Sequence, residues 1–166
     1  GVTTIYVTHD QEEALAISDK VIVMNNAVIA QGGSPKDLYN FPINKFVANF
    51  IGDANVVKAE VINKNSNSYD IKIAEMNIKI QSDNELNGDI SVALRPEKIS
   101  IDRNKGDNCI QATVNNASFV GSSYQYILNS NVGKLYVVSG DTNDVFKVGE
   151  EVFLSINEQE VKILKD

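Results

Sequence analysis

The pattern of apolar and polar positions changes near residue 52 of the 166-residue chain, from mixed strand and helix signals to short strands. At the start, Val2–Thr8 is β-branched and aromatic with apolar side chains on both faces, which is typical of an interior strand of a parallel sheet. Its sheet neighbours would lie upstream of Gly1, so both strand edges would carry unpaired N–H and C=O groups. We therefore expect this segment either to be disordered or to pair with a second chain.

Signals for a helix and a hairpin follow this strand. Asp10–Ser18 has carboxylates in the first turn of a predicted helix, where the helix dipole favours them. We expect the apolar residues Ala14, Leu15 and Ile17 on the inner side of this helix. Lys20–Met24 has the pattern of another buried strand. The Asn25-Asn26 pair predicts a tight turn that joins this strand to Val28–Gln31 in a hairpin.

Two short helices with recognisable starts come next. Ser34 is a typical N-cap, because proline follows it at the first helical position and an acid stands three residues after it. Asn44 can cap a second helix, whose apolar residues form one stripe that ends at Gly52. We place a domain boundary there, which divides the chain into residues 1–52 and 53–166.

Short strands about ten residues apart fill the second part of the chain. The predicted strands are Val56–Ile62, Tyr69–Ile73, Ile78–Ile80, Ile90–Leu94, Ile99–Ile101, Ile110–Phe119, Tyr124–Leu128, Leu135–Val138, Glu151–Ile156 and Val161–Leu164. Turn signals such as Asn87-Gly88 and Lys105-Gly106 separate them. This spacing predicts a mainly β protein with a small barrel or sandwich at residues 53–166.

Composition excludes several functions. The net charge is −7 and the apolar fraction is 43%, as in a globular acidic protein rather than a disordered chain. Residues 53–166 hold twelve basic and seventeen acidic side chains without a basic stripe, which argues against nucleic-acid binding on the barrel. No stretch approaches the roughly 20 apolar residues that a membrane-spanning helix needs.

The residues that could bind metal are few. One cysteine, Cys109, and one histidine, His9, cannot supply a zinc site of the His/Cys type, and we expect Cys109 to be a small apolar side chain in a strand. Asp10, Glu12 and Glu13 stand beside His9, but they do not share one helix face. We therefore expect no metal site in this chain.

His9 stands where a buried strand is expected to meet a helix, which is the edge at which α/β sheets bind ligands. A surface histidine without a ligand is the alternative. The run Thr3–Ala14 (TTIYVTHDQEEA) closely resembles the switch-histidine segment of ABC importer ATPases. Ser18–Met24, Ala30–Pro42 and Phe46–Gly52 are similar to the elements that end the nucleotide-binding domain of that family.

The second part of the chain carries a further resemblance. Ala93–Glu97 (ALRPE) resembles the "LRPE" hallmark of the TOBE module, an OB-like regulatory barrel of these ATPases. The resemblance implies a truncated α/β remnant of the nucleotide-binding domain at residues 1–52, followed by a TOBE barrel at 53–166. The hallmark residues are then Leu94, Arg95, Pro96 and Glu97. Arg95 is either a surface residue that pairs with Glu97 or part of a domain interface.

The chemistry implied by the resemblance is ATP hydrolysis in a longer parent protein, with ATP and magnesium as its ligands. His9 would hydrogen-bond the γ-phosphate and help to place the attacking water. The sequence contains no G-x-x-x-x-G-K-[ST] motif, no Leu-Ser-Gly-Gly-Gln signature and no apolar strand that ends in Asp-Glu. We therefore expect the 166-residue chain to have no ATPase activity and no cofactor of its own.

The resemblance also implies partners and a location. The parent would be a homodimer on the inner face of the cell membrane, docked on permease subunits that receive solute from a binding protein. Phe50–Asn55 and Val120–Tyr126 look most like the spermidine/putrescine group, with ferric iron or another small solute as the second possibility. The alternative function is a free-standing β-barrel module that binds a regulator or a protein without any link to ATP.

Overall fold

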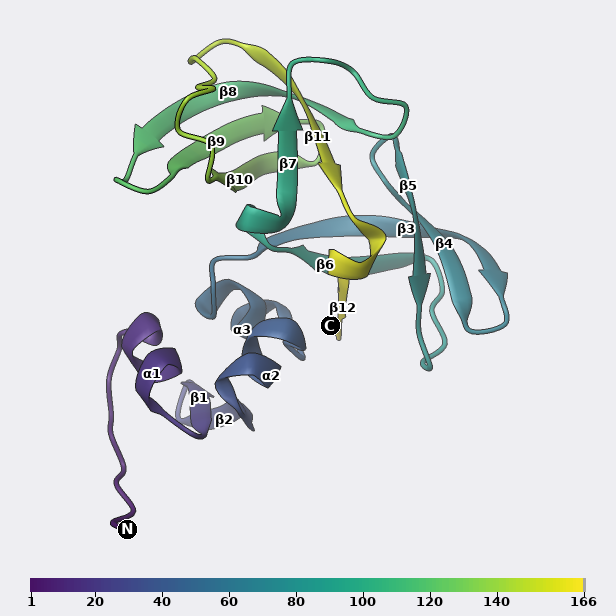
Figure 1. Cartoon of the computed structure of the whole chain (residues 1–166). Coiled ribbons are helices and arrows are strands. Elements are labelled where there is room, and N and C mark those ends of the chain that lie inside the picture. Colours follow the sequence, from purple (N-terminus) through teal and green to yellow (C-terminus); the bar gives the residue numbers. More distant parts are fainter. Residues whose placement is uncertain (166) are drawn as a thin grey trace.

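The structure is a computed structural model that describes residues 1–165, and its fold is mainly β, as the strand spacing predicts (Figure 1). The first fifty residues form a small helical part with one hairpin. Its elements are α1 (Gln11–Ile17), β1 (Val21–Asn25), β2 (Val28–Gly33), α2 (Pro35–Asn40) and α3 (Lys45–Phe50).

The rest of the described chain forms two antiparallel sheets of five strands each. One sheet has the strand order β12 (Lys162–Leu164), β6 (Asp89–Leu94), β3 (Asn55–Asn65), β4 (Ser68–Ile73), β5 (Met76–Gln81). The other has the order β10 (Gly133–Ser139), β9 (Tyr124–Ser130), β8 (Ile110–Phe119), β11 (Glu151–Ile156), β7 (Ile99–Asp102). The short 3₁₀ helices η1 (Pro96–Lys98) and η2 (Glu158–Glu160) lead into β7 and β12.

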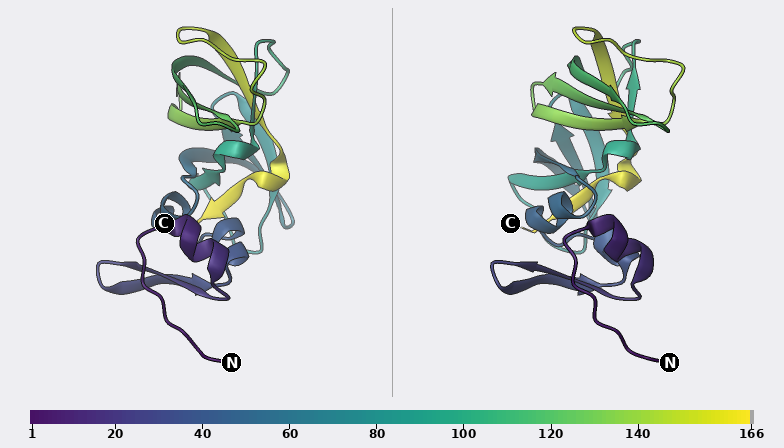
Figure 2. Two further views of the ribbon diagram at one scale, coloured as in Figure 1. Left: turned by 60° about the vertical axis from the view of Figure 1, so that its left-hand side comes forward. Right: turned by 90° about the vertical axis from the view of Figure 1, so that its left-hand side faces the viewer.

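The two sheets curl around one shared apolar core and give an OB-like fold (Figures 1 and 2). Alternation along the strands builds this core: β5 reads buried–exposed throughout, with Met76, Ile78 and Ile80 inside. The side chain of Asn55 joins the sheets like a peptide group. Its Nδ2 donates to the carbonyl oxygen of Tyr136 at 2.7 Å, and its Oδ1 accepts from the Tyr136 N–H at 2.6 Å.

The N-terminal part has a small core of its own, made by Val23, Leu38, Val47 and Ile51. Its helices start where the sequence predicts, because the predicted caps are made. Ser34 Oγ accepts from the Asp37 N–H at 3.2 Å, and Asn44 Oδ1 accepts from the Val47 N–H at 2.9 Å.

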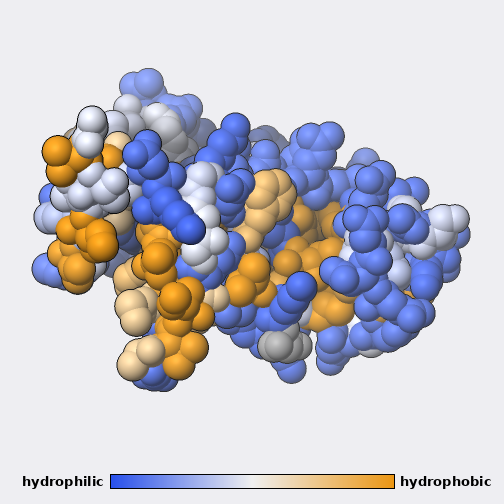
Figure 3. All heavy atoms as spheres, turned by 90° about the horizontal axis from the view of Figure 1, so that it is seen from below, coloured by the Kyte–Doolittle hydropathy of each residue, from blue (hydrophilic) through white to orange (hydrophobic). Residues whose placement is uncertain are grey.

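Two N-terminal segments whose patterns are typical of buried strands are exposed in the structure. Residues 2–8 form no strand, and Val2, Ile5 and Val7 are each about nine-tenths exposed. The β1 strand is not buried on both faces either, because only Val23 within it is buried. Both predictions required neighbouring strands, and β1 pairs with β2 alone, so these apolar side chains stay exposed. Figure 3 shows apolar side chains exposed on the face seen from below.

Two smaller predictions were also wrong. Ile17, expected on the inner side of its helix, is 66% exposed, and α1 contains no fully buried residue. Cys109 does not lie in a strand. It precedes β8, where its Sγ lies 3.2 Å from the carbonyl oxygen of Gly106. Cys109 is half-buried there, directly before the first residue of the strand.

Candidate functional site

The bend that carries His9 is built by short side chains on both sides of it. Asp10 caps α1, with Oδ1 accepting from the Glu13 N–H at 3.0 Å, while Thr8 Oγ1 accepts from the Asp10 N–H at 3.0 Å. Thr8 and Tyr6 also donate to one oxygen of Glu13, at 3.1 and 2.9 Å. Burial is negligible here, and the Glu13 hydrogen bond is the main cause that raises the pKa of the Tyr6 phenol.

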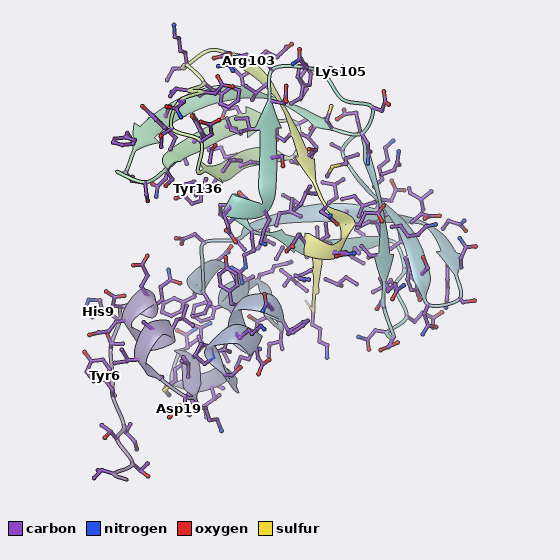
Figure 4. The ribbon with its side chains drawn as sticks, in the orientation of Figure 1. Tyr6, His9, Asp19, Arg103, Lys105 and Tyr136 are labelled. Atoms are coloured by element: carbon purple, nitrogen blue, oxygen red, sulfur yellow. The ribbon has the colours of Figure 1, made fainter. Side chains whose placement is uncertain are left out.

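His9 itself is exposed, at the outer margin of the N-terminal part and away from the two large sheets (Figure 4). The neighbouring carboxylates of Asp10 and Glu13 face their own helix N–H groups and hydroxyls rather than a common centre. Within residues 1–165, no three His, Cys, Asp or Glu side chains are arranged to hold a metal ion. The bend therefore leaves the imidazole of His9 exposed on the surface of the molecule.

Arg95 lies between the N-terminal part and the barrel, and only 4% of it is exposed. Its Nη1 donates to the carbonyl oxygens of Ala48, at 3.1 Å, and of Ile51, and its Nη2 donates to that of Tyr39. These carbonyls lie at the C-terminal ends of α2 and α3, where no N–H of the same helix reaches them. The carbonyl of Ala48 also accepts from the Ala54 N–H at 3.2 Å. Of the two possibilities for Arg95, the structure shows the interface.

The ring of Tyr39 supports this arginine. The guanidinium carbon lies 4.1 Å from the ring centroid, and the phenol donates to Glu97 Oε1 at 2.5 Å. Burial, followed by the hydrogen bond to Glu97, raises the pKa of Tyr39 well above its usual value. Burial lowers the pKa of Arg95, and the nearby oxygens of Tyr39, Glu97 and Asp53 oppose that effect.

We call the contacts of Arg95 and Glu97 with the ends of α2 and α3 the junction. Of the other hallmark residues, two are buried in the core and one belongs to this junction. Leu94 and Pro96 are buried, so they hold the segment in the barrel, while Glu97 is exposed and reaches Tyr39 instead of Arg95. The hallmark is thus a means of attaching β6 to the N-terminal helices.

Gln11 and Gly52 also contribute to the junction, although the sequence pattern does not mark them as functional. Gln11 accepts a hydrogen bond from the Gly52 N–H at 2.7 Å through Oε1, across 41 positions of sequence. Gly52 has a φ of +80°, and a Cβ there would lie 2.5 Å from Tyr39 Cε2. In the sequence, Gly52 indicates a helix end and a domain boundary, and Gln11 belongs to the switch-histidine motif; neither pattern reveals a contact between them.

A groove of about 640 Å³ opens elsewhere, between residues 40–43, β5 and β12. Lys79, Lys162 and Lys165 line it together with the exposed ring of Phe41. His9 and the residues of the junction do not line it. It is therefore separate from both features predicted from the sequence.

Comparison with known proteins finds a family match within the barrel. Residues 92–164, from β6 to β12, match the family model described as TOBE domain. This part of the chain is therefore similar to a TOBE domain. The Arg95 junction therefore lies at the start of the matched TOBE segment, and β3, β4 and β5 of the same fold precede it.

Relatives that include the N-terminal part are named as import ATP-binding proteins. The chain is 32% identical over 164 residues to the "Fe(3+) ions import ATP-binding protein FbpC" of Agrobacterium fabrum, covering 99% of this chain and 46% of that protein. It is 34% identical over 171 residues to the protein of that name from Fusobacterium nucleatum, covering 100% and 45%. For the Brucella abortus protein the identity is 39% over 138 residues, covering 83% and 39%. The chain spans less than half the length of these relatives.

A solved structure confirms the fold class. The cytoplasmic molybdate-binding protein ModG, in a molybdate-bound form, superposes with a TM-score of 0.54 at 14% identity, over 64% of this chain and 92% of that one. At this identity the likeness concerns the fold alone. In residues 1–165, no helix combines the length and the apolar character needed to cross a bilayer.

Proposed function

We propose that the chain is the C-terminal region of the ATP-hydrolysing subunit of an ABC importer. The observation that carries this proposal is the match of nearly the whole chain, His9 segment and TOBE domain together, to proteins named as import ATP-binding proteins. A TOBE barrel alone would leave residues 1–52 unexplained. The exposed apolar faces of residues 2–8 and β1 also fit a segment that is covered in a longer protein.

His9 is the residue of this chain that we assign to the ATP site. An exposed imidazole on a bend fixed by Thr8 and Asp10 can donate a hydrogen bond to a phosphate oxygen without first rearranging the backbone. ATP and magnesium supply the phosphoryl group and its charge neutralisation in this chemistry. The phosphate cradle and the magnesium carboxylate belong, in this proposal, to the remaining half of the protein.

The transported solute is proposed from the relatives' names. The three relatives described above are all named for Fe(3+) import, so we favour ferric iron as the solute of the parent system. The spermidine/putrescine group, expected from residues 50–55 and 120–126, has no such support among them. Permease subunits, a solute-binding protein, homodimer formation and a place on the inner face of the membrane complete the proposal.

A free-standing β-barrel module is the competing function. The sequence of the gene upstream of the Gly1 codon separates the two. The importer proposal requires the phosphate loop, the Leu-Ser-Gly-Gly-Gln signature and the Asp-Glu strand in the same reading frame. An initiation codon at or near Gly1, with none of these motifs upstream, would leave the barrel module as the function.

A further inference from the structure

One peptide group lies between the His9 segment and the TOBE barrel. The carbonyl of Ile51 and the N–H of Gly52 belong to the same planar peptide. Arg95, from the barrel, donates to that carbonyl, while Gln11, from α1, accepts from that N–H at 2.7 Å. Both ends of one peptide are therefore held, each by a different part of the molecule.

This arrangement makes the two contacts depend on each other. A peptide is rigid and planar, so rotating it to release Arg95 also turns the N–H of Gly52 away from Gln11. Hydrogen bonds in series through one peptide also polarise one another, which strengthens both. The geometry requires a glycine, because the φ of Gly52 is +80° and a Cβ would collide with the ring of Tyr39.

The barrel side of the peptide is rigid. Arg95 is buried, stacked on Tyr39 and bound to three helix-end carbonyls, and Leu94 fixes its backbone in the barrel core. The other side is held more weakly. The helix α1 has no fully buried residue, and the contacts of Tyr6 and Thr8 with Glu13 stay within the same segment.

Gln11 thus ties a lightly packed helix to a rigid junction, two residues after His9. We propose that Gln11 is a positioning residue for His9, and that Arg95 of the TOBE barrel sets this position through the Ile51–Gly52 peptide. The inference rests on the proposed role of His9 in ATP hydrolysis. It assigns the barrel a direct means of regulating that role, because a shift of Arg95 changes the anchor of the histidine segment.

The structural part is tested on the 166-residue chain by amide hydrogen exchange. Removing one neutral hydrogen bond by Gln11→Ala is expected to speed exchange at Gly52 and within α1 about fivefold, while β8 keeps its protection. Gln11→Glu retains an acceptor oxygen and restores slow exchange. Glu12→Ala, an exposed neighbour on the same helix, is the matched control and leaves exchange at Gly52 unchanged. Equal exchange in Gln11→Ala and in the unmodified chain would overturn the inference.

The dependence of the Gly52 contact on the barrel is tested with Arg95→Lys. Lysine keeps the positive charge but cannot donate to the three carbonyls in the geometry of the guanidinium. We expect faster exchange at Gly52 in this variant, and little further effect when Gln11→Ala is added, because one peptide carries both contacts. Fully independent effects of the two substitutions would contradict a shared peptide. Unchanged exchange at Gly52 in Arg95→Lys would do so as well.

The functional part is tested in the intact subunit by steady-state ATP hydrolysis. Gln11→Ala is expected to lower kcat about tenfold at unchanged KM, and Gln11→Glu to recover most of it. His9→Ala serves as the reference. If His9→Ala loses turnover and Gln11→Ala does not, the positioning inference fails and the proposed function stands. If His9→Ala itself retains full turnover, the proposed function fails.

Discussion

Replacing Gly52 by alanine tests the junction at its tightest point. The φ of +80° places this residue in the left-handed region, and an added Cβ would lie 2.5 Å from Tyr39 Cε2 and 3.0 Å from Arg95 Nη1. Neither neighbour can move freely. The phenol of Tyr39 is bound to Glu97, and Arg95 is bound to the carbonyls that end both helices.

The expected cost has two parts. An L-residue in the left-handed conformation costs about 1–2 kcal/mol, and overpacking a filled site adds about 1–3 kcal/mol. Gly149→Ala isolates the first part, because Gly149 has a φ of +86° and nothing within 4 Å of the added Cβ. Subtracting the control leaves about 1–3 kcal/mol for the collision with Tyr39 and Arg95.

Thermal unfolding followed by circular dichroism measures the difference. For a chain of this length 1 kcal/mol corresponds to about 2–4 °C, so Gly52→Ala should unfold roughly 2–12 °C below Gly149→Ala. Both variants should unfold below the unmodified chain. Equal melting temperatures for the two variants would show that the junction is loose, and would refute the packing described for Tyr39 and Arg95.

Three further outcomes are expected. The 166-residue chain should bind Mg-ATP no more tightly than millimolar, because the sequence lacks the phosphate-loop motif; micromolar binding in isothermal titration would reveal a missed site. Burial raises the pKa of the Tyr39 phenol in the folded chain, so above pH about 10 the unfolded chain loses this proton first. The stability that the neutral phenol contributes is therefore complete below pH about 10 and falls as the pH rises above it. The stability advantage over Tyr39→Phe, measured by urea unfolding, should therefore shrink between pH 9 and 11, and a constant difference would contradict the assignment. Asn55→Asp should destabilise the chain by about 2–4 kcal/mol, since a carboxylate cannot donate to Tyr136; an unchanged urea midpoint would show that this bridge is dispensable.

Local patterns predicted most of the barrel. Alternation and turn residues give strands such as Ile110–Phe119 and Glu151–Ile156 with the bounds that the structure shows, because each strand needs only neighbours within the same chain. The same reasoning failed for residues 2–8 and for the faces of β1. A pattern of apolar residues indicates that a face can be buried, and it does not say that the covering element is present.

Contacts at the junction were harder to predict. Gln11 and Gly52 are 41 positions apart, and Tyr39 and Glu97 are 58 apart. Periodicity reports which residues share a face of one element, whereas these contacts join four different segments. The sequence left two possibilities for Arg95, and only the arrangement of helix ends around its guanidinium distinguishes them.

The role of His9 is the central claim, and the turnover of the intact subunit tests it most directly. ATP hydrolysis and ATP binding are measured for the unmodified subunit and for His9→Ala. If His9 donates a hydrogen bond to the phosphoryl group during transfer, the His9→Ala subunit should lose most of its turnover while its affinity for ATP stays nearly unchanged. A His9→Ala subunit that hydrolyses ATP at the unmodified rate would contradict the account.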